Sequence, residues 1–103
     1  MSVYPGPSCL IVHLLIQEGE GQTWYDIYWT EQRAQQEVIR RMRRLIEAER
    51  TARDTTQSDH LRLSRIETMI ADREPFVDIC HRWHEYMDCN SRFDIIAQDL
   101  VME

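Results

Sequence analysis

The period of the hydrophobic pattern changes along the chain, and each change marks a predicted element. Residues 9–16 read CLIVHLLI, with apolar side chains on both alternating faces, so we predict a central strand that is buried on both sides. A loop of four to five residues containing Gly19 and Gly21 follows. Residues 22–29 then carry aromatic side chains on both faces, which predicts a strand covered at least partly on each side. The two segments predict an antiparallel hairpin.

Apolar positions next recur at helical spacing over three segments. The first predicted helix begins after the capping residue Thr30 and continues to about Ala52. A stretch rich in capping residues then interrupts the pattern, and we expect Ser58 or Asp59 to start the second helix. Pro75 suits an early position in the third helix, because its missing N–H is not needed there.

The last segment, residues 92–102, returns to mixed alternation and predicts a third strand. In the order β-β-α-α-α-β, this strand can pair antiparallel with the free edge of the first one. We therefore predict an α+β fold in which a three-stranded antiparallel sheet, of order 2-1-3, carries helices on one face. A chain of 103 residues supports one core. The expected single domain, 1–103, has an irregular lead-in over 1–8, a hairpin over 9–29 and a helical part over 30–90.

Composition restricts the chemistry. The chain has 18 acidic and 12 basic residues, a net charge of -6, and no Lys. The absence of Lys excludes a Schiff base and a Walker-type lysine. Cys80 or Cys89 could be a nucleophile with His81 or His84 as its base, but no oxyanion loop is recognisable, so we expect no catalysis and no cofactor. The chain has three cysteines, Cys9, Cys80 and Cys89. An odd and small number of cysteines does not fit a disulfide framework, so we expect the protein in a reducing cytoplasm. The N-terminal apolar run is short and lacks a preceding positive charge, so we expect no signal peptide or membrane span.

Charge is divided unevenly along the chain. Residues 1–31 hold four acids and no Arg, residues 32–71 hold nine Arg against six acids, and residues 72–103 hold three Arg against eight acids. The hairpin and the C-terminal third are therefore expected to form an acidic surface that binds a protein with a basic surface.

Four aromatic residues, Trp24, Tyr25, Tyr28 and Trp29, lie close together in the second predicted strand. Base-stacking platforms need nearby cations, and this hairpin has none, so we expect most of these rings in the core and one or two at a protein interface. The residues expected to contact a partner are Glu18, Glu20, Trp24, Asp26, Tyr28, Asp94 and Asp99.

An alternative binding site lies on the first helix, where four arginines surround Met42. Steps of about 100° turn Met42 inward and spread the arginines over the opposite face, and Glu37 can pair with Arg41. A salt-bridged helix face, a surface that recognises an acidic partner, and a nucleic-acid-binding surface all stay open for this set. Its members are Arg40, Arg41, Arg43 and Arg44.

A second alternative is a metal site in the third helix, where potential ligands lie one turn apart. These residues are Cys80, His81, His84 and Asp88. Their order, HxxHE, differs from the HExxH and HxxEH zinc signatures, and no CxxC pair is present. A buried Cys80 and surface histidines are the favoured interpretation.

The stretch HLLIQEGEGQTWYDIYWTEQRAQQEVIRRM, residues 13–42, resembles small accessory proteins of phages and mobile elements, in which a β-hairpin ends in a Thr-Glu-capped helix with an early Ala. Small acidic anti-CRISPR proteins are similar in outline. The resemblance covers roughly the first half of the chain and carries over no functional residues. It implies an inhibitor or adaptor in the bacterial cytoplasm that binds a CRISPR effector or another nucleoprotein complex. The last strand would also leave an open edge that a second copy can extend.

Overall fold

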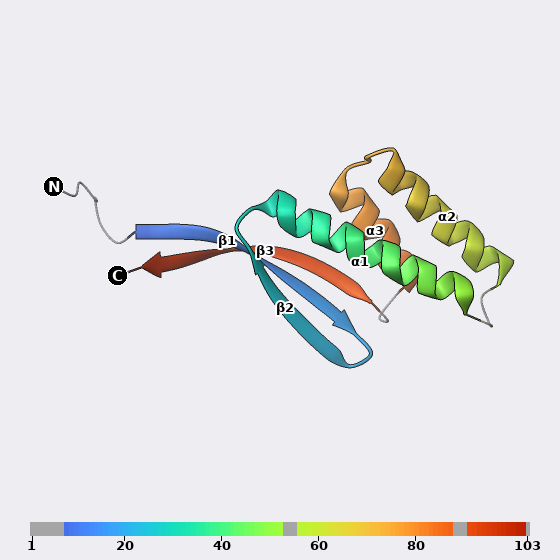
Figure 1. Cartoon of the computed structure of the whole chain (residues 1–103), viewed down its shortest axis with the longest axis horizontal. Helices are drawn as coiled ribbons and strands as arrows, with labels where there is room; N and C mark the ends of the chain where they lie inside the picture. The colour runs from blue at the N-terminus through green and yellow to red at the C-terminus, as the bar shows by residue number, and fades with distance from the viewer. Residues whose placement is uncertain (1–7, 53–55, 88–90, 103) are drawn as a thin grey trace.

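The computed structural model describes residues 8–52, 56–87 and 91–102 (Figure 1). Its three strands form one antiparallel sheet of order β2-β1-β3, so the predicted α+β fold and strand order are confirmed. Ser8 begins the first strand, and the rest of the predicted lead-in lies outside the described residues. The elements are β1 (Ser8–Gly19), β2 (Gln22–Tyr28), α1 (Glu31–Thr51), α2 (Gln57–Ala71), α3 (Phe76–Met87) and β3 (Arg92–Met102).

The hairpin is tighter than the sequence predicts. Gly19 pairs with Gln22, so only Glu20 and Gly21 form the turn. Both have positive φ angles, 51° and 76°, which are those of a two-residue turn whose twist matches the strands it joins. The predicted loop of four to five residues is therefore wrong, because β1 extends three residues beyond Ile16.

β1 and β3 form a two-stranded arm that projects from the rest of the molecule (Figure 1). β3 pairs with β1 along 8–18, whereas β2 pairs only along 13–19. The arm makes the chain elongated, with a radius of gyration of 17.3 Å, against about 13 Å for a compact domain of this size.

Capping residues define the helix starts. Thr30 Oγ1 accepts a hydrogen bond from the Arg33 amide at 3.1 Å, as predicted. The second helix begins earlier than expected because Thr56, and not Ser58 or Asp59, is its N-cap. Thr56 and Asp59 form a capping box, in which each side chain accepts from the other residue's backbone N–H at 3.1 Å.

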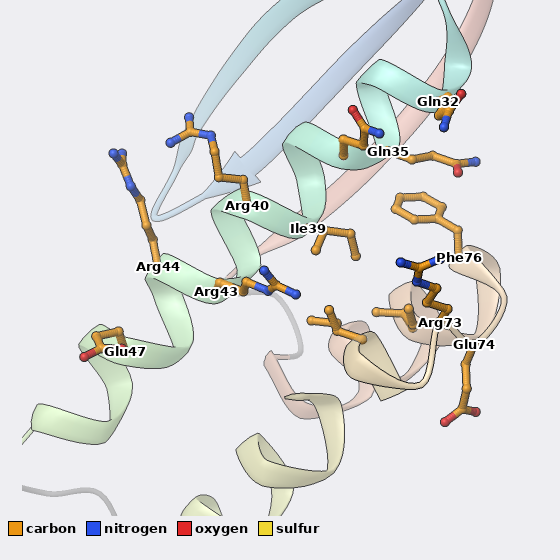
Figure 2. A pocket seen from close by; sticks show the side chains of 13 residues that line it. Gln32, Gln35, Ile39, Arg40, Arg43, Arg44, Glu47, Arg73, Glu74 and Phe76 are labelled. Carbon is orange, nitrogen blue, oxygen red and sulfur yellow. The ribbon is translucent and has the colours of Figure 1, made fainter. Parts of the chain in front are cut away.

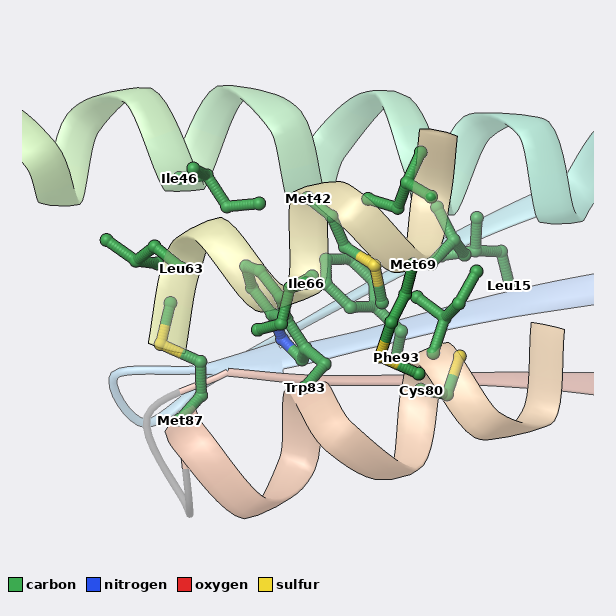
Figure 3. Packing of buried hydrophobic residues seen from close by; sticks show 13 residues of the cluster. Leu15, Met42, Ile46, Leu63, Ile66, Met69, Cys80, Trp83, Met87 and Phe93 are labelled. Atoms are coloured by element: carbon green, nitrogen blue, oxygen red, sulfur yellow. The ribbon is translucent and has the colours of Figure 1, made fainter. Parts of the chain in front are cut away.

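The core lies between the three helices and one face of the sheet (Figure 3). Trp83 and Phe93 are its largest fully buried side chains, and their rings lie 5.9 Å apart at 54°. β1 contributes Leu15 to this cluster. The prediction that the whole run 9–16 is buried on both faces is wrong, because Ile11 is exposed and Leu14 and Ile16 are half-buried. It holds only at Leu15 on the helix side and at Val12, which lies on the opposite face and is also buried.

Candidate binding sites

The sheet face turned away from the helices carries apolar side chains. Leu15 packs in the core, so the residues before and after it on β1 point to the opposite face. There Leu14 is the register partner of both Ile27 and Ile96, and Ile16 is the partner of Tyr25. Tyr25, Ile27 and Ile96 are 63%, 66% and 47% exposed. We call this surface the open face, made of Leu14, Ile16, Tyr25, Ile27 and Ile96.

Most aromatic rings of the hairpin are exposed, so the prediction that they lie in the core is wrong. Trp24, Tyr25 and Trp29 are exposed, and only Tyr28 packs against the core cluster. β2 is an edge strand, and the hairpin projects away from α2 and α3 in Figure 1. An alternating pattern on such a strand does not reveal whether a second layer covers it.

The predicted acidic partner-binding residues do not form one surface. Glu18 and Asp94 share the open face, because Glu18 follows Ile16 by two positions and Asp94 is the register partner of Ile16. Glu20 is exposed in the turn. Asp99 is exposed on the arm, and its side chain points to the face opposite to that of Asp94. None of these four carboxylates has an ion-pair partner among the described residues.

The three other predicted contact residues of the hairpin, Trp24, Asp26 and Tyr28, point to the helix side of the sheet. Asp26 is an anchor for α1, since its Oδ2 accepts from Arg41 Nη2 at 2.5 Å. The remaining donors of Arg41 reach Gln17 Oε1 at 3.0 Å and Glu37 Oε2 at 2.8 Å. The guanidinium therefore fastens α1 to both strands of the hairpin.

Glu37 is shared by two arginines, and the predicted Glu37–Arg41 pair is confirmed. Arg40 donates to both Glu37 oxygens, at 2.8 and 2.7 Å. These hydrogen bonds, with Arg40 the larger cause, outweigh desolvation and lower the pKa of Glu37 to about 2. Arg40 and Arg41 are thus engaged within the molecule, and only Arg43 and Arg44 of the predicted basic set have no ion-pair partner in the described part of the chain.

An open groove of about 970 Å³ lies between α1 and the junction of α2 with α3 (Figure 2). Apolar side chains from all three helices line it, namely Ile39, Ile70, Phe76 and Ile79. The charged side chains along it are Arg40, Arg43, Arg44, Glu47, Arg73 and Glu74. We call this site the arginine groove. The sequence predicts the arginines that α1 contributes to this groove. It does not predict that Arg73 joins them, because Arg73 lies 29 residues from Arg44 along the chain.

Arg73 has a left-handed backbone, with φ 55°. The N–H of Arg73 donates to the Ile70 carbonyl and that of Glu74 to the Met69 carbonyl, both at 3.1 Å. These two bonds form a Schellman motif that ends α2, and its left-handed position is normally occupied by Gly. Arg73 therefore adopts a conformation that disfavours side chains with a Cβ.

Arg73→Gly is expected to raise the free energy of unfolding by about 0.5–1 kcal/mol, because relief of the left-handed strain exceeds the added entropy of the unfolded chain. The melting temperature should rise by about 3–5 °C in a thermal scan followed by circular dichroism. Arg65→Gly, in the middle of α2, is the control and should lower it. A melting temperature of Arg73→Gly below that of the wild type would contradict the assignment of strain.

The potential metal ligands of α3 point to different surroundings. Cys80 is buried, and burial raises its pKa to about 12. His84 Nε2 accepts from the Phe93 amide at 3.3 Å, and burial, with Arg92 nearby, lowers the pKa of His84. His81 Nε2 lies 3.0 Å from Glu85 Oε1 at the surface. Asp88 is outside the described residues, and within 8–52, 56–87 and 91–102 no three such groups converge.

The search for membrane-spanning helices and the comparisons with known proteins both found nothing to report for the described chain. No described helix is long and apolar enough to cross a bilayer. The sites above therefore stand on their own geometry, because no protein-family model, no curated protein and no solved structure matches this chain.

Proposed function

We propose that the protein is a non-enzymatic protein-binding module that docks through its open face. In this proposal it is an inhibitor or adaptor of the anti-CRISPR kind, which acts in the bacterial cytoplasm by occupying a basic surface of a nucleic-acid-handling complex. The observation that carries the proposal is the apolar row of Ile27, Leu14 and Ile96 across the three described strands, in which Ile27 and Ile96 are exposed and Leu14 is half-buried between them.

Two properties of the open face support protein binding. Its exposed side chains belong to rigid paired strands, so little conformational entropy is lost when a partner covers them. Contiguous apolar side chains at a surface are typical of interaction sites, and tyrosine is frequent among the residues that dominate binding energy. Tyr25 and Ile27 are therefore the proposed anchors.

The charges around the open face favour a basic partner. Three carboxylates border it, those of Glu18, Glu20 and Asp94. The arginine beside them is Arg92, the register partner of Glu18, so negative charge is in excess. The excess of carboxylates disfavours phosphate backbones and steers basic surfaces toward the face. The nucleic-acid alternative is weakened by the structure, because Arg40 and Arg41 are held by Glu37 and are not free for phosphate.

The test is capture of partners from the native host with the wild-type chain and two surface variants. Tyr25→Ser/Ile27→Ser should lose a captured protein that the wild type retains, by at least tenfold, because two anchors are removed. Leu61→Ser/Val77→Ser is the matched control, since both of its residues are apolar and exposed but lie on α2 and α3. It should capture the protein as the wild type does.

A purified partner then tests the basic-surface part of the proposal. Glu18→Gln/Asp94→Asn should weaken binding severalfold at low salt and less at high salt, because exposed charges are screened. Equal capture by the wild type and Tyr25→Ser/Ile27→Ser would exclude the open face. Binding that is insensitive to both salt and the carboxylates would exclude a basic partner surface.

A further inference from the structure

We propose that the arginine groove is a second binding site, specific for an acidic peptide segment of a partner protein. In this arrangement a carboxylate of the peptide lies between Arg43 and Arg73, and a neighbouring apolar side chain lies on Ile39 and Phe76. The site is separate from the open face, because it is built by the three helices and not by the sheet.

The two central arginines have unused hydrogen-bonding capacity. Arg43 and Arg73 form no ion pair with any described residue, although Glu47 and Glu74 lie on the same groove. Figure 2 shows the reason: both guanidinium groups point into the groove from opposite sides, whereas the carboxylates of Glu47 and Glu74 point away from it. A bound carboxylate would supply the partner that the chain does not.

The shape and lining of the groove favour a peptide over a small anion. A planar guanidinium donates two parallel hydrogen bonds to a carboxylate, so two arginines can hold one or two acidic side chains. Ile39 and Phe76 lie directly beside them and provide an apolar surface that inorganic phosphate would leave uncovered (Figure 2). A volume of about 970 Å³ is large enough for several residues of a peptide.

Nucleic acid fits the groove less well. Arg40 and Arg44 point away from its centre in Figure 2, and Arg40 is bound to Glu37. Two arginines beside an apolar floor match a short acidic and apolar sequence better than a continuous phosphate backbone, which needs a line of cations. The left-handed Arg73 supports a functional role, because Gly at that position would relieve the strain but remove the guanidinium.

The test uses a fluorescein-labelled peptide that repeats Glu-Leu-Glu-Glu, with fluorescence anisotropy on the whole chain. We expect a Kd on the order of 10–100 µM for wild type. Arg43→Gln and Arg73→Gly should each weaken binding about tenfold, since each removes a charge-assisted pair. Arg65→Gln is the matched control, because Arg65 is an exposed arginine of α2 that does not line the groove. It should bind as the wild type does.

Further probes identify the ligand class. Replacing each Leu of the peptide with Ser should weaken binding severalfold, because the apolar contact is lost. Inorganic phosphate and a single-stranded oligonucleotide should not displace the peptide at comparable charge concentration. Displacement by either one, or binding that is unchanged in Arg43→Gln/Arg73→Gly, would overturn the proposal, as would absence of binding to wild type. Tyr25→Ser/Ile27→Ser should bind the peptide normally, so this test is independent of the open face.

Discussion

Trp83→Ala is expected to lower the free energy of unfolding by about 4 kcal/mol, the largest effect of any substitution proposed for this chain. Trp83 is fully buried where α3 meets α2 and β3, and its ring packs against Phe93. Truncation removes the ring and leaves a cavity that the surrounding helices fill only in part. Urea denaturation followed by circular dichroism measures the loss as a shift of the midpoint.

Two companion variants separate the causes. Trp83→Phe should cost only about 1 kcal/mol, because it retains a ring and removes the indole Nε1, a buried donor with no partner among the described residues. Trp29→Ala deletes an indole that is 68% exposed and should stay within about 0.5 kcal/mol of wild type. Equal effects of Trp83→Ala and Trp29→Ala would contradict the described core.

Arg41→Met is expected to destabilise the fold by about 2 kcal/mol. The substitution keeps much of the apolar stem but removes the donors that join Asp26, Gln17 and Glu37, so the hairpin loses its polar link to α1. Arg44→Met is the matched control, because Arg44 is exposed and forms no ion pair in the described part of the chain. It should stay within about 0.5 kcal/mol of wild type in the same urea measurement.

The same cluster predicts how stability depends on pH. The folded pKa of Glu37, about 2, lies below its ordinary value of 4.5, so its ionised form stabilises the folded state fully above pH 4.5. That contribution is lost as pH falls from 4.5 toward 2. Arg41→Met should reduce this acid-dependent loss without abolishing it, because Arg40 still donates to Glu37. An unchanged pH profile in the variant would show that Arg41 contributes nothing to the low pKa.

Local patterns predict the elements well but not what covers them. The change between a period of two and one of 3.6 locates all three strands and all three helices, and the connections predict the strand order. Tyr25 and Ile27 show the limit, because their alternation with Trp24 and Asp26 is the same whether or not another layer packs on them. Burial depends on where the helices dock, which is a tertiary property.

The arginines of α1 show the same limit for function. Helical steps correctly place Arg40, Arg41, Arg43 and Arg44 away from the buried Met42. They do not reveal that Arg41 meets Asp26, which approaches only when the hairpin folds against α1. Arg73 is missed for another reason, since the signal that ends α2 is usually a glycine and here the chain has an arginine.

The arm formed by β1 and β3 can pair only after the end of the chain has been synthesised. β1 is the middle strand of the sheet, yet Ser8 pairs with Met102, so its second partner is made only after all three helices. During translation the most apolar segment of the chain therefore has one edge without a hydrogen-bonding partner until β3 is made. Such contacts between distant parts of a chain carry a high loop-closure entropy and form slowly. One edge of the strand at the centre of the finished sheet is thus the last to find its partner.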